Sequence, residues 1–241
     1  TKMIVPSVTL MSGVQMPLLG LVTSALRAGY RAFDTGAVYG YEAHLGQVLK
    51  ELLPKYVDYQ QACPIRPWDK GKGRLPEECG WTGLGWRVFT QGYRAHCATL
   101  EEFYASRQFR AIGVSNYNAK HISELLMSFR VPPVALQIEC QPKLIQRELR
   151  DLCIETGIYF QAYSSLGKGA LLREPEIMDI VRSCGRTPAQ VLLRWAVQQG
   201  ISVLPRSSPR RVQENAQVFD FQLSEMDIMR LDALNLRNKV L

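Results

Sequence analysis

From residue 109 onward, runs of hydrophobic residues alternate with polar stretches in an order that predicts strands and helices in turn. Residues 109–115 form a short apolar run with the length of a buried strand. After it, Asn118 can cap a helix whose apolar positions recur at the i, i+3, i+4, i+7 spacing of one helix face. Pro132 and Pro133 then interrupt the chain, so a second strand is predicted at 134–138.

The same rhythm continues toward the C-terminal end. Helices are predicted at about 146–156, 176–184 and 188–199 and from residues 209 and 225, with strands at 158–163 and 201–204. Thr187 with Pro188 is a typical helix start, and Gly157 is a typical helix end. Repeated strand–helix units of this length predict a parallel sheet with right-handed crossovers. No GxGxxG segment follows a strand, which favours a barrel, and we expect one domain spanning 1–241.

The first half of the chain departs from this regular order. Residues 8–21 hold two apolar segments around Ser12 and Gly13, which predicts a hairpin. Only about six residues lie between 21 and 28, whereas a parallel crossover needs about a dozen or more. Residues 57–97 contain three of the four tryptophans, many glycines and prolines, and no strand of clear period, which predicts a loop. The predicted fold class is therefore α/β, a (β/α)8 TIM barrel that is incomplete or irregular in its first half.

Composition and charge exclude several partner classes. Hydrophobic residues make up 46% and charged residues 21%, as in ordinary globular proteins. The net charge is +7, but no run of five basic residues occurs, so we expect a solvated basic surface and no nucleic-acid partner. The six cysteines lack CxxC pairs and zinc-site spacing, which predicts reduced thiols, no metal and a cytoplasmic location. No apolar run reaches the length of a membrane span and no signal-peptide layout is found, so no membrane partner is expected.

Polar residues follow the predicted strands, where the loops of a barrel build its site. They lie at Asp34 to Tyr39, Ser115 and Asn116, Gln137, Tyr163 to Gly167, and from Arg206 onward. Asp34 precedes Tyr39 by five residues, and a carboxylate with a phenol suits proton transfer to a carbonyl oxygen. An ordinary Asp-Thr-Gly turn and a half-buried tyrosine would give the same residues. Because polar residues follow several of the predicted strands, we favour a functional site over these alternatives.

The one local basic cluster is near the predicted helix start at 209 and consists of Arg206, Arg210 and Arg211. Arg206, Ser207 and Arg211 combine charge-assisted hydrogen bonds with the positive end of a helix, which is typical of a phosphate site. A solvated basic turn is the alternative. Because the cluster follows a predicted strand end, we favour the phosphate site.

Five segments resemble the successive signatures of the aldo-keto reductases. They are GYRAFDTGAVYGYEAHLG, FRAIGVSNYNAKHISELL, VALQIECQP, FQAYSSLG and VLPRSSPRRVQENAQVFDF, and the similarity covers about residues 8–53 and 98–233. The chain is most similar to the small, short-tailed, NADPH-dependent carbonyl or glyoxal reductase-like members. The resemblance implies a (β/α)8 barrel that binds NADP(H) and reduces a small-molecule carbonyl substrate, and we expect a monomer.

The resemblance also implies a role for each candidate site residue. Tyr39 would donate the proton, with Asp34 as its supporting acid. The expected cofactor contacts are Ser115, Asn116 and Gln137 at the nicotinamide carboxamide, Tyr163 at the nicotinamide ring, Ser164 and Leu166 at the pyrophosphate, Arg206, Ser207 and Arg211 at the 2′-phosphate, and Glu214 and Asn215 at the adenine. The stretch 206–215 is one residue shorter than the family's usual loop.

Two groups of the family's catalytic tetrad have no counterpart in the sequence. The lysine position falls near Pro64, and no strand ending in His-Trp-Pro occurs before Ala98. Lys70 and His96 are candidate substitutes, although an exposed surface position is the better prediction for His96. Two hypotheses therefore remain: the chain is a carbonyl reductase, or it is a non-catalytic relative that still binds NADP(H).

Overall fold

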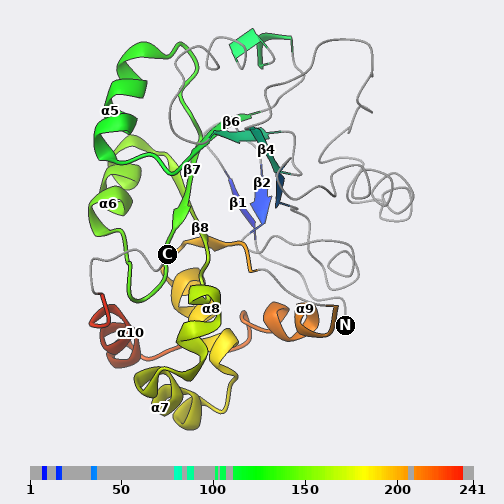
Figure 1. The fold of residues 1–241 in the computed structure, drawn as a ribbon, viewed down its shortest axis with the longest axis vertical. Helices are drawn as coiled ribbons and strands as arrows, with labels where there is room; N and C mark the ends of the chain where they lie inside the picture. The colour runs from blue at the N-terminus through cyan, green and yellow to red at the C-terminus, as the bar shows by residue number, and fades with distance from the viewer. Residues whose placement is uncertain are drawn as a thin grey trace.

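The structure of the 241-residue chain is a computed structural model (Figure 1). It describes residues 7–9, 15–17, 34–36, 79–82, 86–89, 101–102, 104–106, 111–205 and 209–235. For the strands before residue 101 it describes the backbone path and pairing. The short connection at 21–28 lies outside these residues, as do Tyr39, Arg206 and Ser207.

Nine strands form two sheets within this part of the chain. A hairpin pairs β1 (Ser7–Thr9) with β2 (Gln15–Pro17) in antiparallel register, as predicted around residues 12 and 13. The larger sheet has the order β3 (Asp34–Gly36), β4 (Cys79–Thr82), β5 (Trp86–Phe89), β6 (Ala111–Ser115), β7 (Ala135–Glu139), β8 (Tyr159–Tyr163) and β9 (Ser202–Val203). From β5 to β9 every neighbouring pair is parallel, which confirms the predicted parallel order of the second half.

The prediction that 57–97 is loop throughout was wrong at two places. Residues 79–82 and 86–89 form β4 and β5, an antiparallel pair, and β3 pairs antiparallel with β4. Each strand has only four residues, too few for a period of two to stand out, although Trp86, Val88 and Phe89 are good strand formers. Their stabilising partners are β3 and β6, contacts between segments far apart in the sequence.

Helices follow the strands of the second half and cover one side of them (Figure 1). Their bounds are α5 (Ala119–Ser128), α6 (Arg147–Thr156), α7 (Pro175–Cys184), α8 (Pro188–Gln198), α9 (Pro209–Ala216) and α10 (Glu225–Asp232), with a 3₁₀ segment η3 (Gly167–Arg173) that the sequence pattern did not predict. The predicted cap at Asn118 is confirmed, since its side chain accepts from the backbone N–H of His121. At the start of α10, Ser224 accepts from the backbone N–H of Asp227. In the described part of the chain, no helix is long and apolar enough to cross a membrane.

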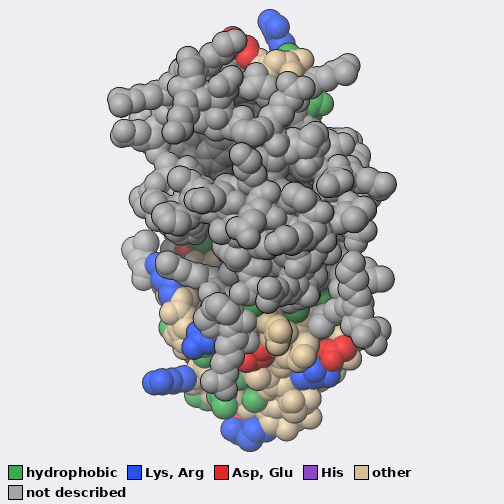
Figure 2. Space-filling model, turned by 90° about the vertical axis from the view of Figure 1, so that its right-hand side faces the viewer, with side chains coloured by type: hydrophobic (Ala, Val, Ile, Leu, Met, Phe, Trp, Pro, Cys, Tyr) green, Lys and Arg blue, Asp and Glu red, His purple; other side chains and the backbone are tan. Residues whose placement is uncertain are grey.

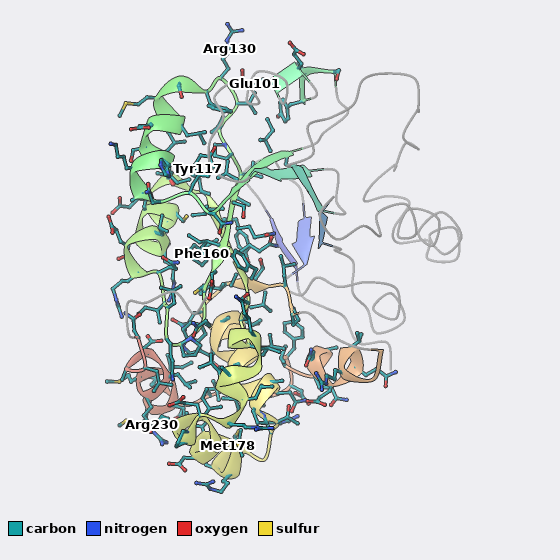
Figure 3. The ribbon with its side chains drawn as sticks, viewed as in Figure 1. Glu101, Tyr117, Arg130, Phe160, Met178 and Arg230 are labelled. Atoms are coloured by element: carbon teal, nitrogen blue, oxygen red, sulfur yellow. The ribbon has the colours of Figure 1, made fainter. Side chains whose placement is uncertain are left out.

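The core lies between the parallel strands and the helices. Ile112, Leu136 and Phe160, from β6, β7 and β8, are buried, and Figure 3 shows Phe160 between the sheet and the helices. Helix α8 is buried from Val191 to Val197, since it packs on η3, α7, α9 and β9. Such a helix is apolar on nearly all sides, so neighbouring elements must satisfy its few polar groups. The indole Nε1 of Trp195 accordingly donates to Asp232 of α10 at 2.7 Å.

Polar contacts hold the outer helices together. Arg230 of α10 forms ion pairs with Glu176 and Asp179 of α7 and with Asp227 of its own helix (Figure 3). Glu101 accepts from the backbone N–H groups of Arg130 and Val131, just beyond α5. On the face in Figure 2, the Lys, Arg, Asp and Glu side chains of the described residues lie interspersed, without a large area of one sign.

Candidate functional site

Four polar residues lie opposite one another across the parallel strands. Ser115 of β6 pairs with Gln137 of β7, Gln137 with Gln161 of β8, and Gln161 with Ser202 of β9. Residues in register on parallel strands project from the same face of a sheet. All four are buried, with exposed fractions of 6%, 9%, 3% and 0%. We call this set the polar row; polar side chains in a buried sheet cost free energy unless they have partners, so they indicate a specific role.

Two amides of the polar row bond to each other. The side-chain Nε2 of Gln137 donates to Oε1 of Gln161 at 2.8 Å. A primary amide has a donor end and an acceptor end, so this bond fixes which end of the Gln137 amide faces β8. The orientation of Gln137 is therefore set by its neighbour strand.

Hydrogen bonds join the ends of β6, β7 and β8 at the polar row and just beyond it. The backbone N–H of Asn116 donates to the carbonyl oxygen of Gln137 at 2.9 Å, and the Tyr163 hydroxyl donates to Oδ1 of Asn116 at 2.8 Å. Asn116 has a φ of 60°, a left-handed conformation that asparagine tolerates better than most residues. A non-glycine residue in this conformation is strained and persists only where surrounding contacts hold it. Such residues concentrate at functional sites. The structure thus brings Ser115, Asn116, Gln137 and Tyr163 together, and we call these four residues the strand-end cluster.

The turn after β8 continues this edge. Ser164 also has a positive φ, 52°, and its carbonyl oxygen accepts from the N–H of Gly167 at 2.8 Å. At Gly167, φ is +55° and an added Cβ would meet Cγ of Leu171 at 2.7 Å. Glycine is required there on both grounds. Ser164 and the half-buried Leu166 therefore lie in a tight turn directly after Tyr163.

A second group of predicted residues lies on α9, which follows β9. Arg211 is exposed, Glu214 is half-buried, and Asn215 is buried with 2% of its surface exposed. Oε1 of Glu214 accepts from the Thr187 hydroxyl at 2.7 Å, and the backbone carbonyl of Glu214 accepts from Nε2 of Gln190 at 3.0 Å. The N-terminal end of α8 therefore holds the last turns of α9.

The candidate acid–base pair is only partly described. The sequence pattern placed Asp34 at the end of a strand, whereas in the structure it is the first residue of β3, and its backbone pairs with Thr82 of β4. Tyr39, Arg206 and Ser207 lie outside the described residues. Their predicted roles therefore stay predictions.

Sequence reasoning missed three residues that support the site. Gln161 stands in an otherwise apolar and aromatic strand, and a polar residue at such a position was the available signal. Thr187 was recognisable as a helix start and Gln190 as a buried polar position. Their hydrogen bonds to Glu214 were not, because Glu214 lies 27 positions from Thr187 and 24 from Gln190.

The buried thiols near the site are chemically quiet. Burial raises the pKa of Cys140, which directly follows β7, to about 12, and burial raises the pKa of Cys153 to about 12 as well. Both side chains are therefore neutral at physiological pH. Within the described ranges, no group of three or more His, Cys, Asp and Glu side chains could hold a metal ion. What the strand-end cluster offers is hydrogen bonds and an aromatic ring, which suit an uncharged amide or a ring ligand.

Comparison with known proteins identifies a family. The sequence profile of the Aldo/keto reductase family matches residues 47–236. The chain is 34% identical over 258 residues to "Uncharacterized oxidoreductase YtbE" of Bacillus subtilis (strain 168), with 94% of this chain and 92% of that protein covered. It is 33% identical over 266 residues to "Glyoxal reductase" of the same organism, with 97% and 94% covered. Both alignments are longer than the 241 residues of this chain, so these relatives hold segments without a counterpart here.

Solved structures agree with the sequence relatives. MGS-M4, an aldo-keto reductase enzyme from a Medee basin deep-sea metagenome library, superimposes with a TM-score of 0.80 at 26% identity, over 97% of this chain and 96% of that chain. Gox0644 in its apoform has a TM-score of 0.78 at 27% identity, over 95% and 93%. These likenesses confirm the predicted α/β barrel class.

Proposed function

The chain belongs to the aldo-keto reductase family, and from that premise we propose that it reduces small aldehydes or ketones to alcohols with NADPH, with Tyr39 as proton donor. The observation that carries the proposal is the strand-end cluster, in which three neighbouring strands direct amide, hydroxyl and phenol groups to one edge. Carboxyl ends of parallel strands are where a barrel builds its active site.

The described residues fit a nicotinamide dinucleotide. A carboxamide has one acceptor and two N–H donors, and Ser115, Asn116 and Gln137 offer matching groups. The Tyr163 ring, held by its bond to Asn116, is available for stacking on a flat heterocycle. Glu214 and Asn215 on α9 offer a carboxylate and an amide of the kind that hydrogen-bond a purine.

Each residue then has a chemical task. NADPH supplies the hydride when it is bound. The strand-end cluster holds the nicotinamide in one orientation, which keeps the substrate carbonyl within reach of the hydride. The Tyr39 hydroxyl gives its proton to the carbonyl oxygen, and the Asp34 carboxylate supports and orients that phenol.

The missing lysine and histidine favour a second candidate, a non-catalytic NADP(H)-binding relative. General acid–base catalysis contributes about 10²–10⁴-fold, so loss of the groups that tune Tyr39 leaves a slow enzyme at best. Lys70 or His96 would have to complete the site for rapid turnover. We further propose a monomer that works in the cytoplasm, where its cysteines stay reduced.

Two measurements on the full chain test these candidates. NADPH binding is followed by fluorescence titration, and its consumption by stopped flow with glyoxal, the aldehyde that a relative's name points to. We expect binding in the wild type, a loss of binding in Asn116→Ala, and unchanged binding in Lys120→Ala, an exposed control on α5. Fast turnover that Tyr39→Phe abolishes supports the reductase; binding with turnover insensitive to Tyr39→Phe supports the non-catalytic relative. Absence of NADPH binding refutes both.

Cofactor preference is a separate question. We propose that Arg206 and Arg211 contact the 2′-phosphate, supported by the exposed position of Arg211 on α9 just after β9. The double variant Arg206→Ala with Arg211→Ala should weaken NADPH much more than NADH, because the phosphate is the only difference between them. Equal losses for both cofactors would contradict this assignment.

A further inference from the structure

The cap of helix α8 contacts the predicted adenine-binding carboxylate of α9. Thr187 is the N-cap of α8, and its Oγ1 accepts from the backbone N–H of Gln190 at 3.3 Å. The same hydroxyl donates to Oε1 of Glu214 at 2.7 Å. A threonine hydroxyl has one proton to give, so its direction is fixed by these two contacts together.

A second contact from the same cap fixes the backbone of Glu214. Gln190, whose exposed fraction is 4%, donates from Nε2 to the carbonyl oxygen of Glu214, while its Oε1 accepts from the N–H of Thr187 at 3.0 Å. Glu214 is therefore held through both its main chain and one carboxylate oxygen. Because Oε1 accepts the hydrogen bond of the Thr187 hydroxyl, this hydroxyl orients the Glu214 carboxylate.

We propose that Thr187 is a positioning residue that aims the Glu214 carboxylate at the amino group of the adenine ring and thereby sets the purine specificity of the cofactor site. The inference rests on the proposed function, since it takes an adenine dinucleotide as the ligand. A carboxylate only accepts hydrogen bonds, so it matches the exocyclic N–H of adenine and is mismatched to the carbonyl oxygen that hypoxanthine carries at the same ring position. If the carboxylate is rotated, the site no longer distinguishes adenine from hypoxanthine.

Selectivity between two cofactors separates positioning from helix capping. The probes are NADPH and its deamino analogue, in which hypoxanthine replaces adenine. In the wild type we expect NADPH to bind about tenfold or more tightly than the analogue, the scale of one hydrogen bond to a charged group. A variant that only weakens the fold lowers both affinities alike and leaves their ratio unchanged.

Three variants of one residue make the test. Thr187→Ser keeps both the cap and the hydroxyl proton, and should keep the ratio. Thr187→Asp is a good N-cap but has no proton for Glu214, and Thr187→Gly is tolerated at an N-cap with a loss of only a few tenths of a kcal/mol. In both, the ratio should fall to within about threefold of unity, as in Glu214→Ala.

The outcomes are distinct. A wild-type chain that binds neither NADPH nor the analogue refutes the proposed function and this inference with it. A wild type that binds NADPH, with a ratio that Thr187→Gly or Thr187→Asp leaves intact, overturns the inference alone. Melting curves of each variant identify one that has not folded, and the remaining donor-free variant then decides the result.

Discussion

The bond between Gln137 and Gln161 predicts a strong energetic coupling inside the sheet. Both side chains are at least nine-tenths buried, and Nε2 of Gln137 lies 2.8 Å from Oε1 of Gln161. Replacing Gln161 with methionine keeps nearly the same length and shape but leaves the buried Gln137 amide without this acceptor. Loss of one partner of a buried hydrogen bond costs about 1–3 kcal/mol. For a chain of this length that corresponds to a fall in Tm of about 2–4 °C per kcal/mol.

The double variant separates this bond from every other contact of the two residues. When both glutamines become methionine, no amide of the pair is left unsatisfied, and apolar replacement of both partners is close to neutral. We therefore expect Gln137→Met and Gln161→Met each to destabilise the protein by about 1–3 kcal/mol, and the double variant by clearly less than the sum. The coupling free energy should be about 1–2 kcal/mol.

Urea unfolding followed by tryptophan fluorescence gives the three free energies, with Trp195 as a fully buried reporter. Gln217→Met, at an exposed glutamine on the chain after α9, is the matched control and should change stability by less than about 0.5 kcal/mol. If the two single effects add within about 0.5 kcal/mol, the two amides do not act as a pair and the reasoning fails.

Three further predictions concern stability. Burial raises the thiol pKa values of Cys140 and Cys153 from 9.0 to about 12, so the stability they contribute is present below pH 9 and lost as pH rises toward 12. From pH 8 to pH 10 the free energy of unfolding should fall by about 1.4 kcal/mol per thiol. Alanine at both positions should remove that part of the pH dependence in urea titrations. Asp232→Ala should cost about 1.5–3 kcal/mol because it strands the buried indole N–H of Trp195, whereas Asp232→Asn, which keeps an acceptor, should cost less; equal melting temperatures for the two variants would contradict this. Gly167→Ala should destabilise by about 1–3 kcal/mol, since φ is +55° and the new Cβ meets the Leu171 side chain; a melting temperature unchanged from the wild type would show that the turn relaxes.

The second half of the fold was predictable because its signals are local. Helix caps such as Asn118 and Thr187 act on N–H groups three residues away, and the apolar period of each helix is readable in a short window. The strands β6, β7 and β8 are short apolar runs bounded by turns, and they stand within one or two residues of their predicted bounds. The strand ends Ser115, Gln137 and Tyr163 could be named as a candidate site for the same reason.

The pairings of the first half could not be read from the sequence. Strands β4 and β5 are four residues long, and what stabilises them is the neighbouring β3 and β6. A strand has no internal hydrogen bonds of its own, so a short one exists only where a partner is supplied. Composition therefore indicated loop where the sheet has two strands.

The sequence by itself determined the family, the order of helices and strands after residue 109, and the polar strand ends, because these depend on neighbours along the chain. Only the tertiary structure decided that Gln161 orients Gln137 and that Thr187 orients Glu214. Those bonds join residues 24 and 27 positions apart, and each exists because sheet register or helix packing brings the two side chains within 3 Å. A hydrogen bond depends on that distance and direction, which no local pattern of residues specifies.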